Sequence, residues 1–269
     1  DLGPSFIKLG QALSVRADLL GEGIADDLGR LRDRLPEFSF DEARQTIESE
    51  LERSLEELFV DFGRKPVAAA SIAQVHFATV ATPDGPAKVA VKVLRPGIEE
   101  KLQQDMDLFF WLARIAERAD PKLKRLRPVD IVRTLQQSVA LEMDLRLEAA
   151  AADEMGEVFQ QDPDFRTPLI DWERTAEHVM TMERVKGVRI DNVEALDRMG
   201  VDRSALLAKA AGAFFQQVFR DGFFHADTHP GNLFALPTDV ICLLDFGIMG
   251  KLDRASRNHL MDLIIHIVT

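Results

Sequence analysis

Residues 223–250 read FFHADTHPGNLFALPTDVICLLDFGIMG, and this stretch decides how the rest of the chain is interpreted. Asp227 is followed five positions later by Asn232. An apolar run, Val240–Leu244, then leads into Asp245-Phe246-Gly247. A short apolar run that ends at a glycine is typical of a strand entering a turn. The stretch therefore predicts a polar loop, a buried strand and a turn that begins with a carboxylate.

These residue types at these spacings match a kinase catalytic loop followed by its metal-binding turn. Phosphoryl transfer needs a carboxylate beside the acceptor, and it needs oxygen ligands that hold Mg²⁺ on the phosphates. We assign the first task to Asp227 and the second to Asn232 and Asp245. His225 is expected to orient the loop rather than to act as the base. Each of the two motifs alone could be an ordinary loop or a strand that ends in a turn. Their combination favours a kinase site.

Composition indicates an ordinary globular protein. The chain length of 269 residues is enough for one large or two modest domains. Its 46% hydrophobic and 29% charged residues are typical of globular proteins. The 45 acidic and 33 basic side chains give a formal charge of −12, so the surface as a whole is not expected to bind nucleic acid.

The single cysteine, Cys242, excludes an internal disulfide and favours a reducing compartment. Its position in the apolar run predicts a small buried core residue. No signal peptide is visible, and a first residue other than Met suggests a piece of a longer protein. The most apolar window, 108–116, contains Arg114 and is far shorter than the ~20 residues of a membrane-spanning helix.

Helical spacing of apolar residues predicts two opening helices that are broken near Gly21 and Gly23. Lys8 and Gln11 fall on one face of the first helix, which by itself indicates a solvated surface. A third helix is expected from Asp41, as N-cap, through Phe59.

From Lys65 the period changes to that of strands. The segments PVAAASIAQVHFATV and AKVAVKVLRP, joined by the turn Pro83-Asp84-Gly85, predict a β-hairpin. Lys92 faces inward from the second strand and needs an anion, either nucleotide phosphate or a helical glutamate.

An alanine-rich loop precedes the hairpin where a kinase would carry glycines against the phosphates. It consists of Ala68, Ala69, Ala70 and Ser71. Each Cβ restricts positive φ, so the loop should be stiffer than a glycine loop. The alternative is a helix N-terminus, which also binds phosphate.

Two long helices are expected over 101–119 and from Pro128 to Phe159. The second contains Glu142, Asp144 and Glu148. A kinase pairs its strand lysine with a helical carboxylate, and we favour Glu148 over Glu142 for this role.

The alternating segment 178–185 predicts a strand that leads into a hinge. Backbone groups at Glu183 and Val185 are candidates to pair with the adenine edge. A helix beyond Asp202 is expected to reach Phe219 and to bury its apolar residues, which are Leu206, Leu207, Ala210, Phe214, Phe215 and Val218.

Six segments together resemble the UbiB family of atypical kinases, also called aarF-domain-containing or ADCK kinases. They are PSFIKLGQALSVRADLL, AAASIAQVH, VAVKVLRPGI, LEMDLRLEAA, FFHADTHPGN and LLDFG. The segment PKLKRLRPVDIVR is similar to bacterial members that serve ubiquinone biosynthesis. The resemblance covers nearly the whole chain.

The resemblance implies ATP and Mg²⁺ as cofactors, and it matches Lys92, Glu148, Asp227, Asn232 and Asp245 to the nucleotide and metal machinery. It also places Lys8 and Gln11 on a helix that covers the substrate pocket and meets the acidic pair Glu142 and Asp144. These four residues are therefore expected to be regulatory.

The implied fold is α+β, with two kinase-like lobes. Its expected parts are a helical extension at 1–64, an N-lobe with inserted helices at 65–185 and a largely helical, truncated C-lobe at 186–269. Helical character is expected to resume over 248–269, which leaves no room for a long activation segment.

The implied function is an ATPase or phosphotransferase that supports ubiquinone synthesis in the bacterial cytoplasm, at the inner membrane. Implied partners are prenyl-phenol or quinone precursors, other ubiquinone-biosynthesis proteins and, through parts outside this fragment, the membrane surface. The alternatives are a conventional protein or small-molecule kinase and a non-catalytic nucleotide-binding scaffold.

Overall fold

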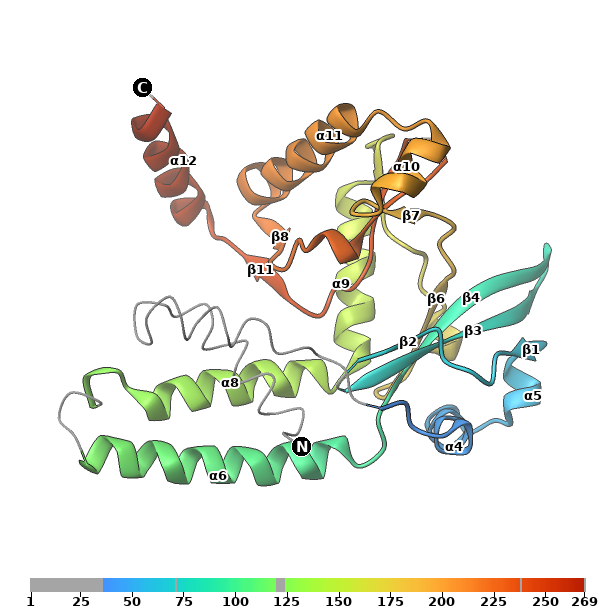
Figure 1. Ribbon diagram of the computed structural model, residues 1–269, viewed down its shortest axis with the longest axis horizontal. Coiled ribbons are helices and arrows are strands. Elements are labelled where there is room, and N and C mark those ends of the chain that lie inside the picture. Colours follow the sequence, from blue (N-terminus) through green and yellow to red (C-terminus); the bar gives the residue numbers. More distant parts are fainter. Residues whose placement is uncertain (1–35, 71, 120–123, 238, 269) are drawn as a thin grey trace. The chain divides into compact units, whose positions relative to one another are not determined.

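The computed structural model describes residues 36–70, 72–119, 124–237 and 239–268 (Figure 1). The opening helices, Lys8, Gln11 and Ser71 lie outside the described residues. The chain divides into two compact units. The first contains the described residues through Leu145 and the segment Arg174–Thr181, and the second contains Arg146–Glu173 and the residues from Met182 onward.

The first unit is organised around a five-stranded sheet of order β1-β3-β4-β6, with β2 paired to β3. The strands are β1 (Asp61–Phe62), β2 (Ala68–Ala69), β3 (Ala73–Thr82), β4 (Gly85–Leu94) and β6 (Val179–Glu183). The β3–β4 pairing runs from Ala73↔Leu94 to Thr82↔Gly85, so the predicted hairpin and its turn are confirmed. Gly85 has a φ of +110°, a conformation that side chains rarely adopt.

Two helices cover this sheet where the sequence predicted one. They are α4 (Phe40–Leu51) and α5 (Leu55–Leu58), and the prediction of a single helix capped by Asp41 was wrong. Ser39 caps α4, and Ser54 begins α5 with a capping box of its own. Ile47 and Leu58 pack with Val80, Val89, Val91 and Val93 in one buried cluster.

Two long helices, α6 (Ile98–Ala119) and α8 (Pro128–Glu142), lie side by side (Figure 1) and share a second apolar cluster. The predicted helix from Pro128 to Phe159 is interrupted at Met143 and Asp144, and a separate helix, α9 (Leu145–Val158), follows. The N–H of Met143 bonds to Ala140, and the N–H of Leu145 bonds to the carbonyl of Glu177. These bonds replace the i→i−4 ladder, so the helix ends there.

The second unit contains a four-stranded sheet of order β5-β10-β9-β7 and a two-stranded sheet, β11-β8. The strands are β5 (Phe165–Arg166), β7 (Val188–Arg189), β8 (Phe223–His225), β9 (Leu233–Ala235), β10 (Ile241–Leu243) and β11 (Met249–Lys251). The helices beyond α9 are α10 (Val193–Met199), α11 (Arg203–Phe215) and α12 (Arg254–Val268). The short helical turns η1 (Trp172–Arg174) and η3 (Pro230–Asn232) lie in loops. Met155, Phe159, Ile241, Leu243 and Phe246 belong to the core of this unit.

The helix predicted beyond Asp202 changes its winding before it ends. After α11 the chain continues as a π-helix, η2 (Gln216–Asp221). Leu206 and Val218 are buried as predicted, but Leu207 is 69% exposed and Phe215 is 54% exposed. Both residues precede the π-helix, so its winding is not the cause. Successive residues of an α-helix point about 100° apart, and the buried face of α11 that contains Leu206 and Ala213 is narrower than the prediction assumed.

Three further predictions have clear outcomes. Cys242 is wholly buried, and burial raises the pKa of its thiol to about 12, which confirms a core residue. The expected helix over 248–269 is preceded by β11, because Met249 and Lys251 pair with β8. Within the described ranges we find no helix that is both long and apolar enough to cross a membrane.

Candidate active site

The predicted catalytic loop connects β8 to β9 and is held by its own polar groups. The carbonyl of Asp227 accepts from the N–H of His229 at 2.8 Å and from Nδ2 of Asn232 at 3.2 Å. The N–H of Asn232 in turn bonds to the carbonyl of His229 at 2.8 Å. Asn232 therefore positions the backbone of Asp227 while its own side chain is fixed.

His225 connects this loop to the Asp-Phe-Gly turn. It is 1% exposed, and its Nδ1 accepts from the N–H of Asp227 at 3.1 Å. Because Nδ1 is an acceptor, the ring proton is on Nε2, which donates to the carbonyl of Asp245. One imidazole thus holds the backbones of the predicted catalytic and metal-binding aspartates, which agrees with the expected orienting role.

The turn at Asp245 has an unusual backbone. Asp245 adopts a φ of +64°, a region in which few residues other than glycine and asparagine are common. The N–H of Leu244 bonds to the carbonyl of Asn232 at 2.8 Å, which joins the turn to the loop. Phe246 is 3% exposed, and its ring lies edge-on to His225 with a centroid separation of 6.0 Å. Left-handed non-glycine residues concentrate at functional sites.

The structure therefore brings Asp227, Asn232 and Asp245 into one hydrogen-bonded network. Both aspartates are exposed, so their carboxylates are accessible to a ligand. The amide nitrogen of Asn232 is engaged with Asp227, and for its Oδ1 we find no donor in the part of the chain that the structure describes. An amide oxygen beside a carboxylate is a suitable ligand set for Mg²⁺. These residues fit the ion that the sequence motif implies.

Sequence reasoning missed Gln217, which supports the same network from the π-helix. Its side chain is 2% exposed, and Oε1 accepts from the N–H of His225 at 3.0 Å. A glutamine within an apolar helical pattern gives no periodic signal of this role. A buried polar side chain needs a partner, and only the structure identifies that partner as His225.

Lys92 lies in the first unit, on β4 opposite Val75, and is half-buried. Its favoured partner Glu148 lies in the second unit, in the first turn of α9, and is 7% exposed. Glu142 and Asp144 are half-buried at the end of α8 and just beyond it. Glu148 is more buried than Glu142, so its charge has the greater need of compensation. Its pairing with Lys92 stays a prediction.

The described part of the alanine-rich segment is neither an open loop nor a helix N-terminus. Ala68 and Ala69 form β2 and pair with Val75 and Gln74 of β3. The N–H of Ala70 bonds to the carbonyl of Ala73 at 2.8 Å, which continues the pairing of this segment with β3. Alanine side chains tolerate the extended conformation that this pairing requires. The stiffness expected of this segment stays a prediction.

Of the predicted hinge residues, Glu183 is the last residue of β6 and Val185 follows the strand. The side chain of Glu183 forms an ion pair with Arg166, and its N–H bonds to the carbonyl of Leu169 at 2.8 Å. The N–H of Glu183 is therefore already hydrogen-bonded within the protein, which leaves its carbonyl as the backbone group for a contact with adenine. Val185 lies two residues beyond, after the strand has ended, and is half-buried.

Comparison with known proteins bears directly on this geometry. Residues 30–269 match the model of a family described as the ABC1 atypical kinase-like domain. The chain belongs to this family. The resemblance noted in the sequence is thereby confirmed, and so is the α+β kinase-like fold.

Curated relatives of this atypical kinase-like domain carry the name probable protein kinase UbiB. The protein from Marinobacter nauticus is 44% identical over 264 residues, and the one from Xylella fastidiosa (strain 9a5c) is 41% identical over 268. Each alignment covers 97% of this chain and 48% of the relative, so the chain spans about half the length of these proteins.

A solved structure is also similar to this atypical kinase-like domain. It is described as the complex of Rv3197 with erythromycin from Mycobacterium tuberculosis, and it is 30% identical with a TM-score of 0.63. The match covers 95% of this chain and 66% of that one.

Proposed function

We propose that this chain binds ATP with Mg²⁺ and hydrolyses it or transfers its terminal phosphoryl group. The observation that carries the proposal is the double hydrogen bond of His225 to the backbones of Asp227 and Asp245. Asp227 accepts the proton of the attacking hydroxyl or water, while Asn232 and Asp245 supply oxygen ligands. When bound, Mg²⁺ neutralises charge on the phosphates.

The remaining nucleotide contacts follow from the kinase resemblance. Lys92 binds phosphate and is oriented by Glu148, and the phosphates are covered by Ala68, Ala69, Ala70 and Ser71. The carbonyl of Glu183 and the backbone of Val185 contact the adenine edge. The burial of Glu148 and the engagement of Glu183 with Leu169 support this division of roles.

Restraint of protein phosphorylation is proposed for Lys8, Gln11, Glu142 and Asp144. The helix that carries Lys8 and Gln11 covers the pocket in which a protein substrate would bind, and the acidic pair holds it there. The basis is the family resemblance, together with the half-burial of Glu142 and Asp144.

The biological setting is proposed from the UbiB name of the relatives. The whole protein supports the synthesis of ubiquinone or a related prenyl lipid, on the cytoplasmic side of the bacterial inner membrane. Its partners are prenyl-phenol or quinone precursors and other proteins of that synthesis.

The metal assignment is tested with Asp245→Asn. The substitution removes a ligand charge but keeps a residue that tolerates positive φ, so the fold should persist. In a thermal shift assay, the stabilisation by Mg–ATP should be largely lost. Asp239→Asn is the matched control, because Asp239 is also exposed and has a φ of 57°. An undiminished nucleotide shift in Asp245→Asn would contradict the assignment.

A further inference from the structure

His178, which immediately precedes β6, is anchored by a single carboxylate from α4. Its Nδ1 lies 2.8 Å from Oε1 of Glu50, and its backbone N–H donates to Oε2 of Glu50 at 3.1 Å. Because a carboxylate is an acceptor, Nδ1 carries a proton. The two bonds fix both the position of the ring and the direction of Nε2.

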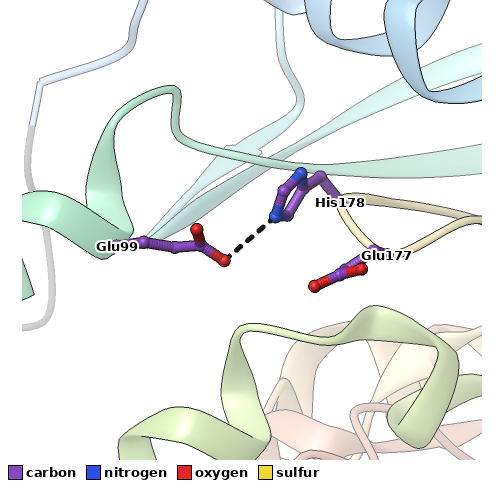
Figure 2. Close-up of side chains that lie close together, drawn as sticks. All are labelled: Glu99, Glu177 and His178. Carbon is purple, nitrogen blue, oxygen red and sulfur yellow. Dashed lines mark hydrogen bonds and ion pairs between the residues drawn. The ribbon is translucent and has the colours of Figure 1, made fainter.

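Two further carboxylates gather at the other side of the ring. Nε2 of His178 lies 3.2 Å from Oε1 of Glu99, which belongs to the first turn of α6. Figure 2 shows Glu99 directed at the ring and the carboxylate of Glu177 beside it. One ligand atom from each of Glu99, Glu177 and His178 lies within 4.8 Å of the other two. All three residues, and Glu50, belong to the first unit.

A neutral imidazole cannot satisfy this arrangement. With the proton on Nδ1, the lone pair of Nε2 faces a carboxylate oxygen at 3.2 Å, so two acceptors oppose each other. Either a second proton on Nε2 or a metal ion must therefore lie between Nε2 and the carboxylate of Glu99. A second proton would provide one bond to one oxygen, whereas a metal ion would bind Nε2 and both carboxylates at once.

We propose that Glu99, Glu177 and His178 form a site for a divalent transition metal of the Zn²⁺ class, with Glu50 orienting the imidazole. Zinc bonds to nitrogen and oxygen are about 2.1 Å long, so neighbouring tetrahedral ligands lie about 3.4 Å apart. The separation of Nε2 and Oε1 is close to this value. The pairing of Nδ1 with Glu50 is the carboxylate–histidine arrangement that orients metal-bound imidazoles.

The charge of the cluster also suits a divalent ion. Glu50, Glu99 and Glu177 place three carboxylates around one imidazole. The same carboxylates attract a metal ion. Three protein ligands leave a fourth position for water or another ligand. The bound ion would cross-link the start of α6 to the segment that leads into β6.

The direct test is a zinc titration of the chelator-treated chain without nucleotide, followed by calorimetry and by the ¹⁵N resonances of the imidazoles. Zinc should bind one site in the Asp245→Asn background, and the Nε2 resonance of His178 should move while Nδ1 stays protonated. Zinc binding that leaves Nε2 unmoved, or no binding at all, would overturn the site. If no zinc binds, a protonated His178 is the cation between the carboxylates.

Matched substitutions locate the ligands. Glu99→Gln and Glu177→Gln should each weaken zinc binding at least tenfold, and Glu50→Gln should weaken it by about 10–100-fold, as expected for a partner that orients a ligand. Glu100→Gln is the control, since Glu100 is an exposed neighbour on α6 outside the cluster. Equal affinity in Glu99→Gln and Glu100→Gln would exclude Glu99 as a ligand and refute the proposed set.

Discussion

His225 has two separable tasks, because each ring nitrogen serves a different aspartate. Nδ1 accepts from the N–H of Asp227, and Nε2 donates to the carbonyl of Asp245. In His225→Asn, the amide oxygen can replace Nδ1, but the bond to Asp245 is lost. In His225→Gln, the amide nitrogen can replace Nε2, but the bond to Asp227 is lost. The two variants therefore test the two sides of the site.

We expect both variants to lower kcat for ATP hydrolysis by about 10–100-fold, since each leaves one buried backbone group unpaired at a cost of ~1–3 kcal/mol. The KM for Mg–ATP should rise only in His225→Asn, because only that variant loses its bond to Asp245. Steady-state kinetics at varied Mg–ATP measures both constants. Identical kcat and KM changes in the two variants would mean that His225 stabilises the fold without a separate role for each nitrogen.

His76 is a second buried imidazole with a defined tautomer, in β3 of the first unit. Its Nδ1 donates to the carbonyl of Gly63 at 2.7 Å, and its Nε2 accepts from Nε2 of Gln74 at 2.9 Å. Burial lowers the pKa of His76, although the bond to Gly63 acts in the opposite direction. Protonation would also place two N–H groups of His76 and Gln74 against each other.

The contribution of His76 to stability should therefore fall as the pH falls through the ordinary histidine range. The folded pKa of His76 is below the unfolded value, so the unfolded state binds more protons below about pH 6.5, and the native state is favoured above it. His76→Asn keeps a donor for Gly63 and removes the titration. Urea unfolding should show a smaller difference between wild type and variant at pH 5.5 than at pH 7.5. A difference independent of pH would contradict this account.

At the scale of elements, we propose that β2 takes the place of the glycine-rich loop of an ordinary kinase. Ala69 pairs with Gln74, so the chain that approaches the proposed phosphate site is held in a strand. Ala69→Gly should free this segment to reach positive φ and should cost about 0.5–1 kcal/mol of stability. We expect the ratio of ATP to ADP affinity to change by about fivefold or more, equivalent to ~1 kcal/mol.

Ala81→Gly is the matched control for this prediction. Ala81 is an exposed alanine at the other end of β3, opposite Pro86. It should show a similar loss of stability with an unchanged ratio of nucleotide affinities, both measured by calorimetry. If the two variants alter the ratio equally, β2 has no special influence on the nucleotide.

The elements that the sequence predicted best are those with a strong local signal. The β3–β4 hairpin has alternating valines and a Pro-Asp-Gly turn, and both were located correctly. The break between α4 and α5 depends instead on Ser54 and its capping box, within a run of residues that all tolerate helix. The end of α8 depends on Leu145 bonding to Glu177, a residue 32 positions later in the chain (177 − 145). Such a bond has no counterpart in local periodicity.

At the scale of the whole molecule, the sequence could indicate those candidate-site residues that lie close together in one short stretch. Asp227, Asn232 and Asp245 lie within 19 residues (245 − 227 + 1), and the structure joins them as that spacing suggested. Gln217 and the metal cluster were not predicted. Gln217 reaches His225 because the π-helix turns it inward, and Glu50, Glu99 and His178 come from three distant segments. Their chemistry depends on the tertiary fold.

The central claim is that the chain turns over Mg–ATP through Asp227. The most direct measurement is release of radiolabelled phosphate from γ-labelled ATP by the purified chain, with and without vesicles that contain a prenyl-phenol lipid. We predict Mg²⁺-dependent release that the lipid stimulates and that Asp227→Asn lowers about 100-fold or more, as expected for loss of a general base. Equal release by wild type and Asp227→Asn, or no release under any of these conditions, would contradict the account.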